Sequence, residues 1–307
     1  MRVLLAGTPA LAIPIFDAIF KSDIDTIGVI TNPPKSKGRS NQLVPSPVSE
    51  WARERNLAVH EDGNLSKIRD LISEADLVLV VAFGKLIPRE LLELPKYGWA
   101  NIHFSHLPEA RGAAPVQRLI AQGATEIGYT LFRLDEGMDT GPIYFRSKTV
   151  SIAQLTTGET WELLTNRASQ EIVSLLHQVE SGLTPIPQDS YKGPNAIAPK
   201  ISTEEARIVW DESSVVVANK VRAFNPAPSA WTTLRNERFI IHRVGVANVN
   251  LPQKANPGAL CVLGDSAYVA TGDGWIELIE VQQSGKRKYL TSEWLRGFRV
   301  RAEESFR

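Results

Sequence analysis

The sequence contains a single cysteine, Cys261, and its 34 Lys and Arg residues are balanced by 34 Asp and Glu residues. One cysteine cannot form an internal disulfide, and without a cysteine cluster no structural zinc site of the usual kind is expected. A chain with no net charge creates no overall field that would draw it to nucleic acid or to a membrane surface. These absences favour a protein of the cytoplasm, a reducing compartment, and leave its partners to be inferred from motifs.

Long apolar runs are also missing. No stretch approaches the roughly 18 apolar residues that a membrane-spanning helix needs. The opening MRVLLAGTPALA loosely mimics a secretory signal, but Gly7-Thr8-Pro9 interrupts its apolar run. We therefore expect neither a membrane partner nor a leader peptide.

The first half of the chain alternates apolar runs with segments of helical periodicity, a pattern typical of a parallel sheet covered by helices on both faces. We expect strands at residues 2–6, 25–31, 57–60 and 76–83, and helices at residues 10–21, 46–55, 65–73 and from 157 to about 182. This organisation predicts a doubly wound, mostly parallel α/β domain at residues 1–182. Ligands of such sheets bind beyond the carboxyl ends of the strands, so motifs that follow strands are the first candidates for a site.

The second half has a different pattern. Residues 183–205 carry four prolines and little periodicity, which indicates a linker. Beyond it, short segments rich in β-branched residues are separated by Gly, Pro, Asn or Asp, as in a small β-barrel. We expect a second domain at residues 206–307, with strands at residues 206–211, 229–235, 238–244, 258–264, 266–272 and 274–282.

The stretch NIHFSHLPEARG begins with two side chains suited to acyl chemistry. Asn101 and His103 alternate just after an apolar run, so in an extended chain they point the same way. An amide and an imidazole that converge on one point can donate hydrogen bonds to the oxyanion of a carbonyl under attack, and losing such a donor typically costs about a hundred- to a thousandfold in rate. Alternatively, Asn101 ends the strand and His103 is a satisfied, half-buried histidine.

A second polar stretch, RLDEGMDTGPIYF, predicts a strand, a tight acidic turn and another strand. Asp139 lies in this turn between two glycines. Its carboxylate could hold the His103 ring in one tautomer, raise the pKa of the ring and help to carry a proton. Alternatively, Asp139 satisfies its own backbone in an Asx-turn, the role that we expect for Asp135 and Glu136.

Other chemistries find little support in the sequence. Ser105 lacks the strand-to-helix elbow of a G-x-S-x-G nucleophile, and Cys261 lies in the other domain. His103 and His106 would need further metal ligands at suitable spacing, and none is evident. The residues therefore favour direct attack of a neutral amine on a carbonyl through a tetrahedral intermediate, without a metal.

NIHFSHLPEARGAAPVQRLIAQG, followed by GYTLFRLDEGMDTGPIY, resembles the folate-dependent formyltransferases, and most closely those that act on methionyl initiator tRNA. The resemblance covers essentially the whole chain, because five further segments are similar to the same family. These segments are LLAGTPALAIPIFDAI, KGRSNQLVPSPVSEWA, IAPKISTEEARIVW, VRAFNPAPSAWT and SGKRKYLTSEWLRG. It implies a formyltransferase domain followed by an OB-like, tRNA-binding barrel. It also implies transfer of the formyl group of 10-formyltetrahydrofolate, a cosubstrate, to the α-amino group of methionine on initiator tRNA. We expect a monomer.

The resemblance assigns roles to particular residues. It implies that Asn101, His103 and Asp139 are catalytic, and that a loop contacts folate through Ser105, His106, Leu107 and Pro108. His106 stands where the family commonly has leucine, which leaves the role of this side chain open, while the backbone could still contact the pterin.

The resemblance also implies contacts with tRNA. The family's inserted loop after the second strand reaches the acceptor end, and here it carries Lys35, Lys37 and Arg39. The basic cluster Lys286, Arg287 and Lys288 could touch RNA backbone from the barrel. The alternatives are a solvated connector for the loop and a solvated hairpin for the cluster.

Arg111 has two interpretations. It could face a substrate carboxylate or phosphate, or it could bond to the acidic turn at Asp135 and Glu136.

Rival functions share parts of the pattern. Formyltransferases of nucleotide-linked amino sugars have the same Asn-x-His and distant Asp. Glycinamide ribonucleotide formyltransferase has the same catalytic set but generally lacks a second domain. A formyltetrahydrofolate hydrolase would use water as acceptor. The stretches PPKSKGRSNQLVPSP and FNPAPSAWT favour the tRNA enzymes. A catalytically silent RNA-binding protein is disfavoured because all three catalytic residue types are present.

Overall fold

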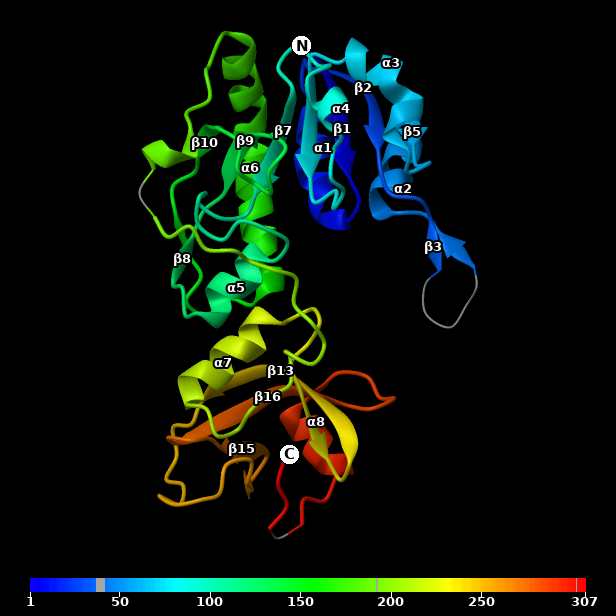
Figure 1. Cartoon of the computed structure of the whole chain (residues 1–307). Coiled ribbons are helices and arrows are strands. Elements are labelled where there is room, and N and C mark those ends of the chain that lie inside the picture. Colours follow the sequence, from blue (N-terminus) through cyan, green and yellow to red (C-terminus); the bar gives the residue numbers. More distant parts are fainter. Residues whose placement is uncertain (37–41, 192, 302) are drawn as a thin grey trace. The chain divides into compact units, whose positions relative to one another are not determined.

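The computed structural model describes residues 1–36, 42–191, 193–301 and 303–307 (Figure 1). These residues form two compact units. The first unit consists of Met1–Pro115, Ile127–Val150 and Trp161–Ala198, and the second of Val116–Glu126, Ser151–Thr160 and Pro199–Arg307.

The first unit is built on a seven-stranded sheet with the strand order β10-β9-β7-β6-β1-β2-β5. Strands β5, β2, β1, β6 and β7 pair in parallel, whereas β9 pairs antiparallel with both β7 and β10. The expected doubly wound, mostly parallel arrangement is confirmed. The strands are β1 (Arg2–Gly7), β2 (Asp25–Ile30), β5 (Val59–His60), β6 (Leu77–Val81), β7 (Trp99–His103), β9 (Thr130–Arg133) and β10 (Ile143–Arg146).

Both faces of the central strands are buried, which is why these strands appear in the sequence as continuous apolar runs. Leu4 and Val78 pack on one face of the sheet. They belong to a core cluster that also contains Trp99, and Ile72 and Leu91 from two helices. Their neighbours Val3 and Leu77 point to the other face and are equally buried.

Helices connect the strands, as the periodicity predicted. The expected helix over 46–55 is found as α2 (Pro47–Glu54), which begins where the Ser46 hydroxyl accepts a hydrogen bond from the Ser49 N–H and where proline takes the first helical position. The other helices are α1 (Ile13–Phe20), α3 (Arg69–Glu74), α4 (Arg89–Leu92), α5 (Pro115–Ala121) and α6 (Thr157–Glu180), with 3₁₀ turns η1 (Ala10–Ala12), η2 (Leu65–Ile68) and η3 (Gln188–Ser190). Two small ribbons complete the list: β3 (Lys35–Ser36) with β4 (Leu43–Val44), and β8 (Glu126–Ile127) with β11 (Val150–Ser151).

The second unit contains an antiparallel sheet in the order β12-β13-β16-β15-β14, with β17 paired to β16. The β-rich second domain expected for this part of the chain is found as this antiparallel sheet. Its elements are β12 (Trp231–Leu234), β13 (Glu237–Val246), β14 (Leu260–Leu263), β15 (Ser266–Ala270), β16 (Trp275–Gln283), β17 (Tyr289–Leu290), α7 (Ser214–Ala223) and α8 (Thr291–Gly297).

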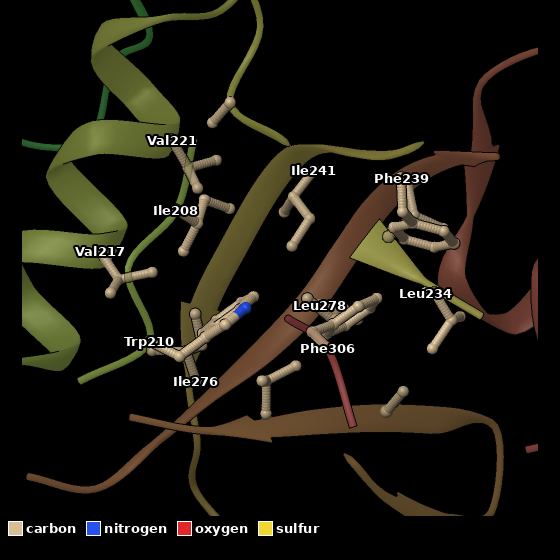
Figure 2. Packing of buried hydrophobic residues seen from close by; sticks show 14 of the residues in the cluster. Ile208, Trp210, Val217, Val221, Leu234, Phe239, Ile241, Ile276, Leu278 and Phe306 are labelled. Atoms are coloured by element: carbon tan, nitrogen blue, oxygen red, sulfur yellow. The ribbon is translucent and has the colours of Figure 1, made fainter. Parts of the chain in front are cut away.

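The strand expected at residues 206–211 is not found. Arg207 forms an isolated parallel bridge with Trp231, and the side chains of Ile208 and Trp210 enter the core of the unit instead (Figure 2). There the Trp210 ring stacks on Phe306, with 5.6 Å between ring centroids. The apolar pattern of this segment therefore reflects burial rather than strand pairing.

Over the part of the chain that the structure describes, no helix is both long and apolar enough to cross a membrane.

Candidate active site

Strand β7 fixes the positions of Asn101 and His103. It lies between β6 and β9, so that Asn101 pairs with Val80 on one side and with Phe132 on the other, and His103 pairs with Thr130. Asn101 is half-buried, and within the described part of the chain its side-chain amide makes no hydrogen bond. The amide is thus held on a central strand with its bonding capacity unused.

The His103 ring is buried and contacts two polar groups and one aromatic ring of the protein. Its Nδ1 lies 3.5 Å from Oδ2 of Asp139, and its Nε2 lies 2.9 Å from the carbonyl oxygen of Ala110. The edge of the ring meets Phe132 at 6.3 Å between centroids. The structure therefore brings His103 and Asp139 together from separate segments of the chain.

The partners of His103 determine its tautomer. A carbonyl oxygen can only accept, so Nε2 carries the proton and donates it to Ala110. In the neutral ring, Nδ1 then presents its lone pair toward Asp139, at a distance longer than an ordinary hydrogen bond. Protonation at Nδ1 would turn this contact into an ion pair.

Burial lowers the pKa of His103, and the Asp139 charge and the Ala110 carbonyl oppose this effect without reversing it. The carboxylate thus acts in the expected direction, but the net direction is opposite to the one that the sequence suggested. The cause is desolvation, because a buried imidazolium loses its hydration. The ring is consequently neutral at neutral pH.

Backbone geometry holds Asp139 in place. Its φ of 53° lies in the left-handed region, and its Oδ2 accepts a hydrogen bond of 2.7 Å from the Gly112 N–H. Gly112 itself has a φ of 116°, and a Cβ atom there would lie 2.8 Å from the Ala198 carbonyl oxygen. Glycine is required at this position, because a side chain would push the backbone away from the carboxylate.

The loop of Ser105, His106, Leu107 and Pro108 is tied to β9. The Thr130 hydroxyl donates to the Ser105 carbonyl oxygen at 2.6 Å and accepts from the Leu107 N–H at 3.1 Å. The side chains of Ser105, Leu107 and Pro108 are buried. In this conformation these three residues expose almost no surface, side chain or backbone, to a ligand.

His106 is half-buried and has a structural partner. Its Nε2 lies 2.8 Å from the Ser147 carbonyl oxygen, to which it donates. Burial lowers the pKa of His106, and the nearby Arg146 charge lowers it further. The imidazole is thus a neutral ring bonded to Ser147, the residue that follows β10.

Arg111 does not bond to the acidic turn, so the second of its two interpretations is wrong. Its Nε and Nη2 both donate to Oε1 of Gln188, at 3.0 and 2.6 Å. In the acidic turn, Asp135 accepts from Gly137 and Thr140 as an Asx-turn should, whereas Glu136 pairs with Arg89 at 3.0 Å. Asp135 and Glu136 are therefore satisfied without a direct bond from Arg111.

The basic residues proposed to contact tRNA are exposed where the structure describes them. Lys35 lies in β3, next to the segment that contains Lys37 and Arg39, and these two lie outside the described residues. Lys286, Arg287 and Lys288 precede β17 and are exposed. Two of these three are offset by carboxylates, since Arg287 lies 3.9 Å from Glu293 and Lys288 lies 2.9 Å from Glu280.

Several groups at the site were missed by the sequence analysis. They are the Ala110 carbonyl, the Gly112 N–H, the Thr130 hydroxyl and the Gln188 amide. Backbone groups carry no residue-type signal. In the described ranges no group of three or more His, Cys, Asp and Glu side chains is arranged to hold a metal ion.

A buried histidine beside a carboxylate, with a free amide on the same strand at the end of a parallel sheet, is an arrangement suited to acyl transfer. The sequence agrees with this class: the profile described as "Formyl transferase" matches residues 1–179, and "Formyl transferase, C-terminal domain" matches residues 200–299. The chain belongs to the formyl transferase family. The family expected from the motifs is thereby confirmed.

Individual relatives and solved structures show which formyltransferases this chain is similar to. The chain is 37% identical over 302 residues to a methionyl-tRNA formyltransferase of Arthrobacter sp. (strain FB24), covering 97% of each chain. In fold it is similar to the methionyl-tRNA formyltransferase of Clostridium thermocellum, with a TM-score of 0.56, 18% identity and coverage of 81% of this chain and 95% of that one. It is also similar in fold to an N-formyltransferase of Helicobacter canadensis in complex with folinic acid and dTDP-3-aminofucose, with a TM-score of 0.64, 16% identity and coverage of 94% and 100%.

Proposed function

We propose that this protein transfers the formyl group of 10-formyltetrahydrofolate to the α-amino group of methionine on initiator tRNA. The observation that carries the proposal is the 37% identity to a methionyl-tRNA formyltransferase over both family regions, which includes the segments that hold Asn101, His103 and Asp139. The folate is a consumed cosubstrate, and the chemistry needs no metal.

In the proposed reaction the neutral amine attacks the formyl carbon, and the carbonyl oxygen becomes an oxyanion. The free amide of Asn101 donates to this oxygen, and the Nε2–H of His103 donates to it once the oxygen has displaced the Ala110 carbonyl. The bond between the formyl carbon and N10 then breaks. The amine loses one proton and N10 gains one, so the reaction balances without an external acid or base.

Asp139 supports the proton transfer in this proposal. Nδ1 is the ring nitrogen without a proton and it faces Asp139, so it can take up the proton of the attacking amine by way of the carboxylate. The Asp139 carboxylate, 3.5 Å away, stabilises the imidazolium that forms. Because burial keeps the resting ring neutral, the base is ready at neutral pH.

Substrate contacts are proposed at three places. Ser105, His106, Leu107 and Pro108 would contact the folate, with backbone groups in the main role. Two basic segments would contact tRNA phosphates: one carries Lys35, Lys37 and Arg39, and the other carries Lys286, Arg287 and Lys288. The KM for tRNA should therefore rise steeply with salt.

The domain assignment follows from these roles. We propose that residues 1–182 form the catalytic domain, that residues 183–205 join it to the next domain, and that residues 206–307 form an OB-like, tRNA-binding domain. A monomer that works in the cytoplasm fits these substrates.

The test uses methionine-charged initiator tRNA and methionine-charged elongator tRNA side by side, with 10-formyltetrahydrofolate as donor. We expect formylation of the initiator and almost none of the elongator, measured by separating formylated from free aminoacyl-tRNA. Comparable rates on both would contradict the assigned specificity. If the protein transferred the formyl group only to a nucleotide-linked amino sugar, or hydrolysed the folate without any transfer, the acceptor proposed here would be wrong.

A further inference from the structure

The chain returns to the site after α6. Residues 184–191 and 193–198, here called the site strap, contact both loops that carry the chemistry. At one end Ile186 exchanges backbone hydrogen bonds of 2.7 and 2.8 Å with Ile143, the first residue after the turn that holds Asp139. At the other end Arg111, on the loop that follows His103, is bonded through its backbone to Ala196 and Ala198.

Gln188 lies between these two attachments and joins the same two loops through its side chain. Its Nε2 donates to the carbonyl oxygens of Asp139 and Gly141, both at 2.8 Å. Its Oε1 accepts both bonds from Arg111. The residue is 4% exposed, so water does not compete for these bonds.

The chemistry of this position suits a glutamine. Two carbonyl oxygens need two donors, and a guanidinium needs an acceptor, and a primary amide supplies both from one planar group. A glutamate of the same shape would keep the Arg111 bonds but would turn an oxygen toward the two carbonyls. A methionine would fill the space and make none of the bonds.

We propose that Gln188 is a positioning residue for Asp139. It acts through the backbone of the turn, holding the carboxylate 3.5 Å from His103 without touching either substrate. The inference rests on the proposed formyl transfer, since it assigns Gln188 a role in that reaction. A direct bond between the loops runs from the Gly112 N–H to Asp139 itself, and Gln188 holds the backbone from which that carboxylate projects.

The experiment compares Gln188→Met and Gln188→Glu with a matched control, Gln178→Glu. Gln178 is exposed on α6 and contacts Ser174, so the control makes the same chemical change away from the site. For both Gln188 variants we expect kcat to fall by about thirtyfold to a hundredfold, because a displacement of about 1 Å at reacting groups costs on this order. The KM values for folate and tRNA should change less than about threefold, because binding groups are untouched.

A second readout does not depend on turnover. The imidazole of His103 is titrated by NMR in the free protein, and its signal is assigned by its loss in His103→Asn. In Gln188→Met the pKa of His103 should fall below that of the wild type, because the Asp139 charge that raises it has moved away. Gln178→Glu should leave the titration and kcat unchanged.

The outcomes separate the two ideas. A kcat and a His103 titration that both remain at wild-type values in Gln188→Met would overturn the inference, as would a rise in KM equal to the fall in kcat. Where Gln188→Met does not fold, as judged by circular dichroism, Gln188→Glu decides on the kcat and KM values, because it retains the Arg111 bonds. A wild-type protein that does not formylate initiator tRNA would sink the proposed function, whereas the titration would still report whether Gln188 positions Asp139.

Discussion

Replacing Asp139 by asparagine removes the charge beside His103 and preserves the shape of the side chain. The asparagine oxygen can still accept the 2.7 Å bond from the Gly112 N–H, so the turn should keep its conformation. That same oxygen faces Nδ1 of His103 at 3.5 Å, so the amide nitrogen takes the place of Oδ1 and the charge beside the ring is lost. The variant therefore lacks the charge that stabilises an imidazolium, and the neutral ring is favoured.

The distance gives the size of the effect. At 3.5 Å, an effective dielectric constant of about 20 makes the attraction between imidazolium and carboxylate roughly 5 kcal/mol, an upper bound on the loss. Solvent screens it little, because the two side chains are only 6% and 16% exposed. Positioned proton-transfer groups typically contribute about a hundred- to ten-thousandfold. We expect kcat for Asp139→Asn to fall by about a thousandfold.

The assay is formylation of charged initiator tRNA at saturating folate, with KM measured for both substrates. Asp135→Asn is the control, because Asp135 lies in the same turn and only accepts hydrogen bonds from Gly137 and Thr140. We expect this control to retain nearly full activity. An Asp139→Asn enzyme whose kcat stays within about threefold of the wild type would refute the role given to the carboxylate.

Three further predictions concern neighbouring groups. His103→Ala should lose about a hundred- to a thousandfold in kcat while folate binding, measured by fluorescence titration, changes little; equal losses in both would make His103 a binding residue. Thr130→Val leaves the Ser105 carbonyl and the Leu107 N–H without a buried partner, so urea unfolding should show a loss of about 1–3 kcal/mol; a variant as stable as the wild type would show that the loop does not depend on Thr130. Burial lowers the pKa of His60, His103 and His106 from 6.5, so as the pH falls the unfolded state takes up protons before the folded state does. The free energy of unfolding should therefore keep its full value above pH 6.5 and decline below it. His106→Leu should flatten that decline in urea titrations at several pH values.

The sheet of the first unit was predictable because burial on both faces leaves a strong signal. Strand β6 is a run of five buried apolar residues, and it lies within the run from which a strand was expected. The second unit gave a weaker signal. Helix α7 was missed because its three consecutive valines favour a strand, although the Ser213 hydroxyl caps the helix at Val216 and Val217 packs into the core.

The candidate site was predictable to the extent that residue types carry it. Asn101 and His103 could be paired from their alternation on one strand, and Asp139 was singled out by its turn and by family resemblance. Gln188 could not be found in this way, because it lies in a proline-rich stretch without periodicity, 49 residues from Asp139. The Ala110 carbonyl, which fixes the tautomer of His103, belongs to an alanine that nothing in the sequence marks as functional.

The site strap has a practical consequence for dissecting this protein. A shortened chain that stops where α6 ends would contain Asn101, His103 and Asp139 and would still lack Gln188. Arg111 would then lose the Gln188 oxygen that accepts its hydrogen bonds, and the carbonyl oxygens of Asp139 and Gly141 would lose the Gln188 amide that donates to them. Such a piece would possess every reactive side chain and still be a poor catalyst, so the shortest version worth making retains the backbone through Ala198.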